Sequence, residues 1–190
     1  YDIFSPPVAS RVYMYPTIAA YAVMQKQYPK KYEDMAGQLS DFKTIPEIND
    51  PDIHAELAAI HAFLKVGTAL IFSENKIIEY RDSLYASLEK DGLPSSVKEA
   101  SLAYGDLVAA HILAWADTDF YKQTRTFPKY TIQEGTAFWK PTPPDYMEGI
   151  EPHWNKIRTL VLDTADQFEP APPYPVDMSK DSPFYKELME

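Results

Sequence analysis

The sequence lacks cysteine and holds only six glycines among its 190 residues. Without cysteine the chain can form no disulfide framework, thiolate nucleophile or thiolate metal site. The glycines show neither a Gly-x-Gly-x-x-Gly nor a P-loop pattern, so a nucleotide-phosphate cradle is not expected. Gly-x-Ser-x-Gly and His-Glu-x-x-His are missing too, which removes the usual signatures of α/β-hydrolases and zinc peptidases.

Positive charge and long apolar runs are also scarce. The 18 Lys and Arg residues are outnumbered by 28 Asp and Glu, so the net charge is −10, and the longest basic run is Lys30-Lys31. DNA and RNA are not expected as partners, because phosphate contacts need clustered cations. No apolar run approaches the ~20 residues of a membrane span. With 45% hydrophobic residues, the chain is nevertheless expected to form one soluble globular domain.

Proline is abundant instead, with 17 residues, about twice its usual share. Ser5 followed by Pro6-Pro7 predicts a helix that continues to about Gln27, with a kink or restart at Pro16. Asp50-Pro51 predicts a second helix start, because the apolar residues that follow recur at helical spacing.

This second helical pattern extends, with a break near residues 73–75, to a turn at 91–94 that contains glycine and proline. Ser96 and Glu99 fit a capping box that begins another long helix. Since only a short turn separates the helices on either side of it, we expect them to be antiparallel.

Beyond Arg125 the pattern changes. Residues 130–139 mix β-branched and aromatic side chains, which predicts an extended segment or a small hairpin. Pro141-Thr142-Pro143-Pro144 predicts a stiff connector. Apolar spacing predicts one more full helix over about 151–168, and Ser182-Pro183 opens a last amphipathic helix.

These patterns together predict an all-α fold. We expect a multi-helix bundle with long antiparallel helices, proline-rich connectors and at most a small extended segment near 130–139, in a single helical domain over residues 1–190. The last helix reaches Glu190 without a cap, so we expect the natural polypeptide to continue.

Metal-ligating patterns are sparse. The Glu-x-x-His pairs of carboxylate-bridged di-iron bundles are missing. His54 and His61 are seven residues apart on one helical face, which leaves open a metal role, although a structural role is the more economical interpretation. We therefore assign no metal ligand.

Aromatic and acidic groups leave two further alternatives open. Several aromatic residues could line a ligand groove, but packing in the core or an interface is the favoured interpretation. They are Tyr13, Tyr15, Tyr21, Phe138 and Trp139. Two acidic pairs could act in acid/base catalysis, but a solvated face or a helix-end salt bridge is the favoured interpretation. The pairs are Asp117 with Asp119 and Asp163 with Asp166.

Four segments in order resemble the N-terminal helical region of bacterial proteins related to vanadium-dependent haloperoxidases, within the type 2 phosphatidic acid phosphatase superfamily. They cover nearly the whole chain, and the combination is more specific than any single piece. The segments are Asp2 to Arg11, Ala55 to Phe63, Tyr104-Gly105-Asp106 with Trp115 to Asp119, and Trp139 to Pro144 followed by Pro152-His153-Trp154 and Ala165 to Phe168.

The resemblance implies a catalytic apparatus of Lys…Arg-Pro, Pro-Ser-Gly-His and Ser-Arg with a later histidine, which holds vanadate or phosphate. None of it is present here. Pro94-Ser95 is followed by Ser96-Val97, Ser10-Arg11 has Thr17 where histidine is needed, and Lys156-Ile157-Arg158 is not followed by proline. We assign no catalytic, cofactor-binding or metal residue to this chain, and expect vanadate only in a full-length protein.

The leading hypothesis is a non-catalytic N-terminal helical domain, inactive alone, that packs against the C-terminal catalytic half of the same protein. The resemblance does not choose between haloperoxidase and phosphatase chemistry. Isolated, the chain is expected to form oligomers or aggregate, because its apolar stripes would be incompletely covered. The alternative is a free-standing helical binding or scaffold module. By resemblance only, we expect a location outside the cytoplasm, periplasmic or secreted.

Overall fold

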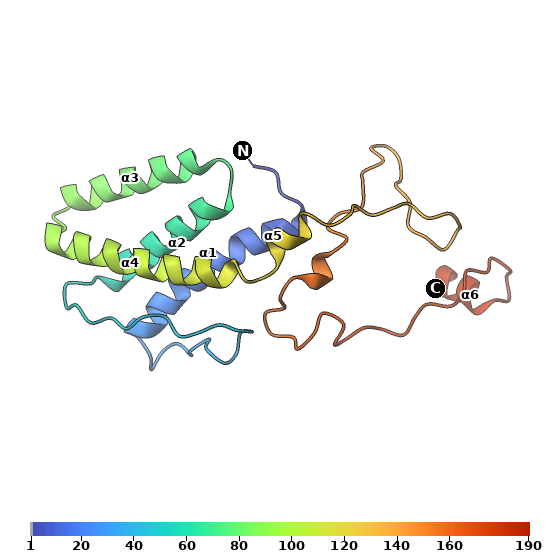
Figure 1. Cartoon of the computed structure of the whole chain (residues 1–190), viewed down its shortest axis with the longest axis horizontal. Helices are drawn as coiled ribbons and strands as arrows, with labels where there is room; N and C mark the ends of the chain where they lie inside the picture. The colour runs from blue at the N-terminus through green and yellow to red at the C-terminus, as the bar shows by residue number, and fades with distance from the viewer. Residues whose placement is uncertain (1) are drawn as a thin grey trace.

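The computed structural model describes residues 2–190, which form six α-helices, one 3₁₀ turn and no β-strand (Figure 1). The predicted all-α fold is confirmed. In chain order the elements are α1 (Pro6–Gln27), α2 (Ala55–Leu70), α3 (Glu74–Lys90), α4 (Ser95–Ala116), α5 (Tyr121–Thr124), the 3₁₀ turn η1 (Trp154–Lys156) and α6 (Pro183–Met189). Within the described residues, no helix is both long and apolar enough to cross a membrane.

The core lies where α1, α2 and α4 pack against one another. Its fully buried side chains include Tyr15 and Val23 of α1, Val66 of α2 and Ile112 of α4. Helix α1 continues through Pro16 as one helix, so the restart that was one of the two expected outcomes, beside a kink, does not occur. These three helices, the segment 28–54 between α1 and α2, and residues 117–125 are called the helical body below; α3 is not included.

Helices α2 and α4 approach each other closely at Gly105. A Cβ atom at this position would lie 2.8 Å from Cδ2 of His61 and 2.9 Å from the carbonyl oxygen of Ala58, both on α2. Because real Cβ atoms do not approach backbone oxygens so closely, the crossing needs glycine here.

Helix α3 lies beside the body and runs opposite to α4, as predicted (Figure 1). Only one of its residues, Tyr85, is buried. The turn that follows is a Schellman motif: the N–H of Leu93 donates to the Leu88 carbonyl at 3.0 Å, and Gly92 has a φ of +94°. The predicted glycine stop is therefore confirmed.

Two predicted helix starts are wrong by a few residues. Helix α2 begins at Ala55 instead of at Asp50-Pro51, because His54 is the N-cap and its ring accepts the N–H of Leu57 at 3.4 Å. Helix α4 begins at Ser95, with Pro94 at the N-cap and no side-chain cap bond, so Ser96 and Glu99 form no capping box.

The helix predicted over 151–168 does not form beyond the single turn η1. At Ile157 the backbone becomes extended, with φ −76° and ψ 142°. Contacts to the body replace helical hydrogen bonds at residues 158 and 160: the N–H of Arg158 donates to the Asp119 carbonyl at 3.0 Å, and the Leu160 carbonyl accepts from the Ser40 N–H at 2.8 Å. Apolar spacing alone could not reveal this competition.

The segment 130–139 forms no strand, although its ends meet where the Tyr130 hydroxyl donates to the Trp139 carbonyl at 3.3 Å. The last predicted helix is confirmed as α6. The Ser182 hydroxyl caps it by accepting the N–H of Tyr185 at 3.0 Å.

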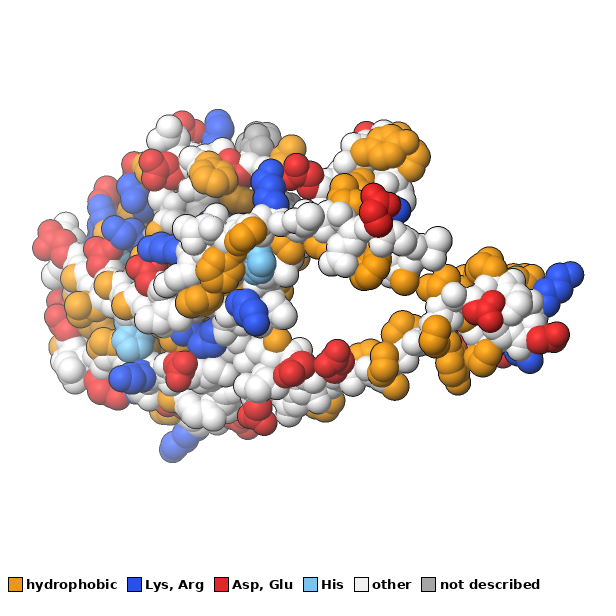
Figure 2. All heavy atoms as spheres, turned by 45° about the vertical axis from the view of Figure 1, so that its right-hand side comes forward, with side chains coloured by type: hydrophobic (Ala, Val, Ile, Leu, Met, Phe, Trp, Pro, Cys, Tyr) orange, Lys and Arg blue, Asp and Glu red, His pale blue; other side chains and the backbone are white. Residues whose placement is uncertain are grey.

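Residues 126–181, called the arm, extend away from the helical body (Figure 1). None of them is buried. The arm returns to the body around residues 151–160 and then leaves again, so Figure 2 shows an open gap between the body and the far end of the arm. The molecule thus combines a packed helical part with a long segment that has no core of its own.

Candidate functional site

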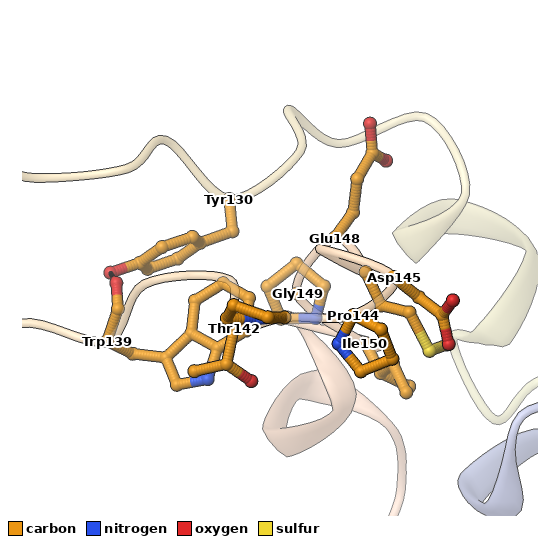
Figure 3. Close-up of a pocket in the computed structure, with 11 residues that line it drawn as sticks. Tyr130, Trp139, Thr142, Pro144, Asp145, Glu148, Gly149 and Ile150 are labelled. Atoms are coloured by element: carbon orange, nitrogen blue, oxygen red, sulfur yellow. Dashed lines mark hydrogen bonds between the residues drawn. The ribbon is translucent and has the colours of Figure 1, made fainter.

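A pocket of about 570 Å³ lies within the arm. The rings of Tyr130 and Trp139 meet edge to face on one side of it, with centroids 5.5 Å apart. Figure 3 shows the carboxylates of Asp145 and Glu148 pointing away from these rings, and Glu148 pairs with Lys129 at 2.7 Å. The pocket is therefore an apolar, aromatic surface without a charged group directed into it, which suits protein contact better than chemistry.

A buried polar network lies next to the body's core, around Asp119. One oxygen of its carboxylate accepts from Arg11 Nε at 2.6 Å and from the Tyr15 hydroxyl at 2.9 Å. The other oxygen accepts the N–H of Tyr121 at 2.9 Å. Burial, together with the negative charge of Asp119, raises the pKa of Tyr15, so the phenol stays protonated and remains a donor. This network joins α1 to the segment after α4.

Two more arginines surround the network. Arg158 lies over the Trp115 ring, with its guanidinium carbon 4.5 Å from the ring centroid. Arg125 binds Glu151, and this hydrogen bond holds the pKa of the Glu151 carboxyl below its usual value. A pocket of about 490 Å³ opens beside Arg11 and Arg158 and is walled by apolar side chains of residues 154–165.

A second polar cluster connects α3 to the body. His61 on α2 is buried; its Nδ1 is hydrogen-bonded to the Tyr85 hydroxyl of α3, and its Nε2 lies 3.1 Å from Asp106 of α4. Lys65 also pairs with Asp106 at 3.1 Å. Burial lowers the pKa of His61, although the Asp106 carboxylate opposes the shift. The role of this cluster is to hold three helices together.

The structure gives the two candidate metal ligands different partners. His54 caps α2 and lies near Glu56, whereas His61 is buried between Tyr85 and Asp106. Within residues 2–190, no group of three or more His, Cys, Asp or Glu side chains gathers in a way that could hold a metal ion.

The candidate aromatic and acidic residues divide in the same way. Tyr15 is core, Tyr13 is exposed, and the Tyr21 hydroxyl donates to the Glu33 carbonyl. Trp139 lines the arm pocket, which agrees with the less favoured interpretation, a ligand groove. Of the acidic residues only Asp119 is buried; it forms an ion pair, while Asp117, Asp163 and Asp166 are exposed.

Sequence reasoning missed the network of Arg11, Asp119 and Arg158. One signal was available, because Arg11 falls between Val8 and Tyr15 on the apolar stripe of α1, where a charged residue needs a buried partner. Its partner lies 108 residues away, and spacing cannot identify it.

No protein-family model and no curated protein sequence matches the chain. A solved structure does, with 48% sequence identity over 99% of this chain and a TM-score of 0.91; it is described as the first bacterial vanadium-dependent iodoperoxidase. The chain is vanadium haloperoxidase-like. The predicted resemblance is thereby confirmed for the haloperoxidases. The haloperoxidase-like chain spans 45% of the iodoperoxidase chain, slightly less than half of its length.

Proposed function

We propose that this chain is a non-catalytic N-terminal helical domain of a vanadium haloperoxidase-like protein, and that its arm packs against an oxyanion-binding catalytic bundle in the C-terminal half. The observation that carries the proposal is the arm: none of residues 126–181 is buried, although 12 of the 23 exposed large hydrophobic side chains lie there. An apolar surface of this extent is typical of a protein contact. In the iodoperoxidase, more than half of the chain lies outside the match. A segment of that length is large enough to be the partner of the arm.

Vanadate would belong to that partner. A highly charged oxyanion needs several cations that are not already paired. Of the four arginines, Arg11, Arg81 and Arg125 are each paired with a carboxylate, so Arg158 alone is left, and the whole chain carries a net charge of −10. These residues do not fit vanadate, so the cations that hold it would come from the catalytic bundle. The relative's description favours haloperoxidase over phosphatase chemistry for the whole protein; a location outside the cytoplasm stays a prediction.

The first test measures turnover by the purified 190-residue chain. With peroxide, iodide and vanadate we expect no vanadate-dependent oxidation of iodide, because residues 2–190 offer no set of unpaired cations that would hold vanadate. Omission of vanadate is the control. Vanadate-dependent turnover would show that the chain is itself catalytic and would contradict the proposal.

The second test measures association through the arm. Size-exclusion chromatography should show the isolated chain as oligomers, because the apolar arm lacks its partner. Replacing Trp139 and Ile150 by serine should shift the chain toward monomer, since both line the arm pocket. Leu107→Ser, at an exposed position of α4, is the matched control and should leave the profile unchanged. Equal shifts in both variants would remove the arm from the explanation.

A further inference from the structure

The carboxylate of Asp119 already has a cation as its partner. Arg11 balances its charge, and the carboxylate also accepts from the Tyr15 hydroxyl and the Tyr121 N–H. The side chain of Asp119 is almost completely buried, at 3% exposure. No second cation nearby can therefore be neutralised by this carboxylate.

Arg158 is that second cation. One terminal nitrogen donates to the Thr118 hydroxyl at 2.8 Å, and the other donates to the Trp115 carbonyl at 2.9 Å and to the Tyr15 hydroxyl at 3.3 Å. All three acceptors are neutral. The Nε–H of Arg158 is buried and has no hydrogen-bond partner within residues 2–190. A partly buried guanidinium with neutral acceptors and one idle donor lacks a counter-charge.

The space beside Arg158 has the size and lining of a ligand pocket. Its volume of about 490 Å³ lies in the range of small-molecule sites. Arg11, Tyr15, Asp119 and Arg158 form its polar end, with two guanidinium groups against one carboxylate. Apolar walls include Ile157, Leu160 and Leu162. A ligand in this pocket would meet one unbalanced positive charge at one end and hydrocarbon along its length.

We propose that the pocket between α1 and residues 154–165 binds a small monocarboxylate with an apolar body, through the guanidinium of Arg158. A carboxylate in the pocket would accept a charged hydrogen bond from Nη1, because this nitrogen bonds only Thr118 and keeps a second N–H. The buried Nε–H lies out of the ligand's reach but close enough to report on it. One net positive charge suits a monoanion and not phosphate. The inference goes beyond the proposed function, because the site lies entirely within this chain.

Hexanoate, hexanamide and acetate are suitable probes for the monomeric fraction of the purified chain. Binding is followed by the Arg158 Nε–H signal in two-dimensional NMR and by the intrinsic fluorescence of the three tryptophans, of which Trp154 lines the pocket. Hexanoate should bind saturably and shift the Nε–H signal, and hexanamide should bind about tenfold more weakly because it cannot form the charged hydrogen bonds. Acetate should also bind more weakly, because it lacks the apolar body.

Arg158→Gln should weaken hexanoate binding about tenfold or more. Lys156→Gln is the matched control, because this exposed cation lies two residues away and does not line the pocket; it should leave binding unchanged. If Arg158→Gln fails to fold, the comparison of hexanoate with hexanamide on the unsubstituted chain still decides the matter.

Three results would overturn the proposal: equal affinities for hexanoate and hexanamide, an unchanged affinity in a folded Arg158→Gln chain, or no saturable binding of hexanoate at millimolar concentrations. Neither the turnover test nor the association test of the proposed function depends on these outcomes, so the two ideas fail separately.

Discussion

Gly105 sets how closely two helices of the body can approach, and alanine tests this directly. A methyl group there would collide with His61 and with a backbone oxygen of α2. We expect Gly105→Ala to lower the free energy of unfolding by about 1–3 kcal/mol, because the strain outweighs the gain in helix propensity. Urea denaturation measures the change.

Gly67 on α2 is the matched control for this substitution. A Cβ atom there would lie 3.6 Å from Ile77 and 3.8 Å from Pro16, which is ordinary contact distance. Gly67→Ala should therefore be neutral or stabilising, by up to about 1 kcal/mol. If both alanines have the same effect, the close approach at Gly105 is not what matters.

His61 makes stability depend on pH. Because burial lowers its pKa below the ordinary 6.5, the unfolded chain takes up a proton first as the pH falls. The stability contribution is therefore complete above about pH 6.5 and declines as the pH falls from there toward the lower pKa of the folded state. Urea unfolding from about pH 7.5 to about pH 5 should show this loss.

His61→Gln should be less stable at every pH but should flatten the pH dependence. His153→Gln is the control and should keep it, since His153 bonds only the Pro128 carbonyl and a glutamine amide can replace that bond. An unaltered slope in His61→Gln would assign the pH dependence to other groups.

Among the four long helices, α1 to α4, α3 is attached most lightly. Its one buried residue, Tyr85, is hydrogen-bonded to His61, and at its end Glu89 pairs with Lys98 of α4. Native-state hydrogen exchange should show α3 amides opening at a lower free energy than those of α2 and α4. Tyr85→Phe should lower the opening free energy of α3 by a further ~1–3 kcal/mol, because the His61 nitrogen loses its partner.

Tyr80→Phe is the control for this prediction, since Tyr80 is an exposed tyrosine on the same helix. It should leave the exchange of α3 unchanged. Equal opening free energies in α2, α3 and α4 would instead show that the three helices unfold as one unit.

Elements with local signals could be predicted from the sequence. The Pro6-Pro7 start of α1, the Gly92 stop of α3 and the Ser182 cap of α6 each depend on residues next to one another in the chain. The helix expected over 151–168 fails for the opposite reason: body residues Ser40 and Asp119 take up its backbone groups. The candidate site follows the same division, because the Asp119 network joins three distant parts of the sequence.

For the whole molecule, the contrast between body and arm predicts where proteases cut. In the monomeric fraction, brief digestion with proteinase K should cleave within residues 126–181 first, because that backbone lies outside the core. Residues 151–160 should resist longer than residues 161–178, since they bond to the body. First cuts within α1, α2 or α4 would contradict this division, and mass spectrometry of the fragments would reveal them.

The ion pair between Arg11 and Asp119 also concerns how the chain is made. Its partners are 108 residues apart, so at roughly 5–20 residues per second the ribosome needs about 5–20 s after Arg11 to deliver Asp119. Arg158 arrives later still. During that interval α1 exposes an arginine within its apolar face and lacks the carboxylate that makes burial favourable. The helical body is thus a late product of translation, completed only once the residues that follow α4 have emerged.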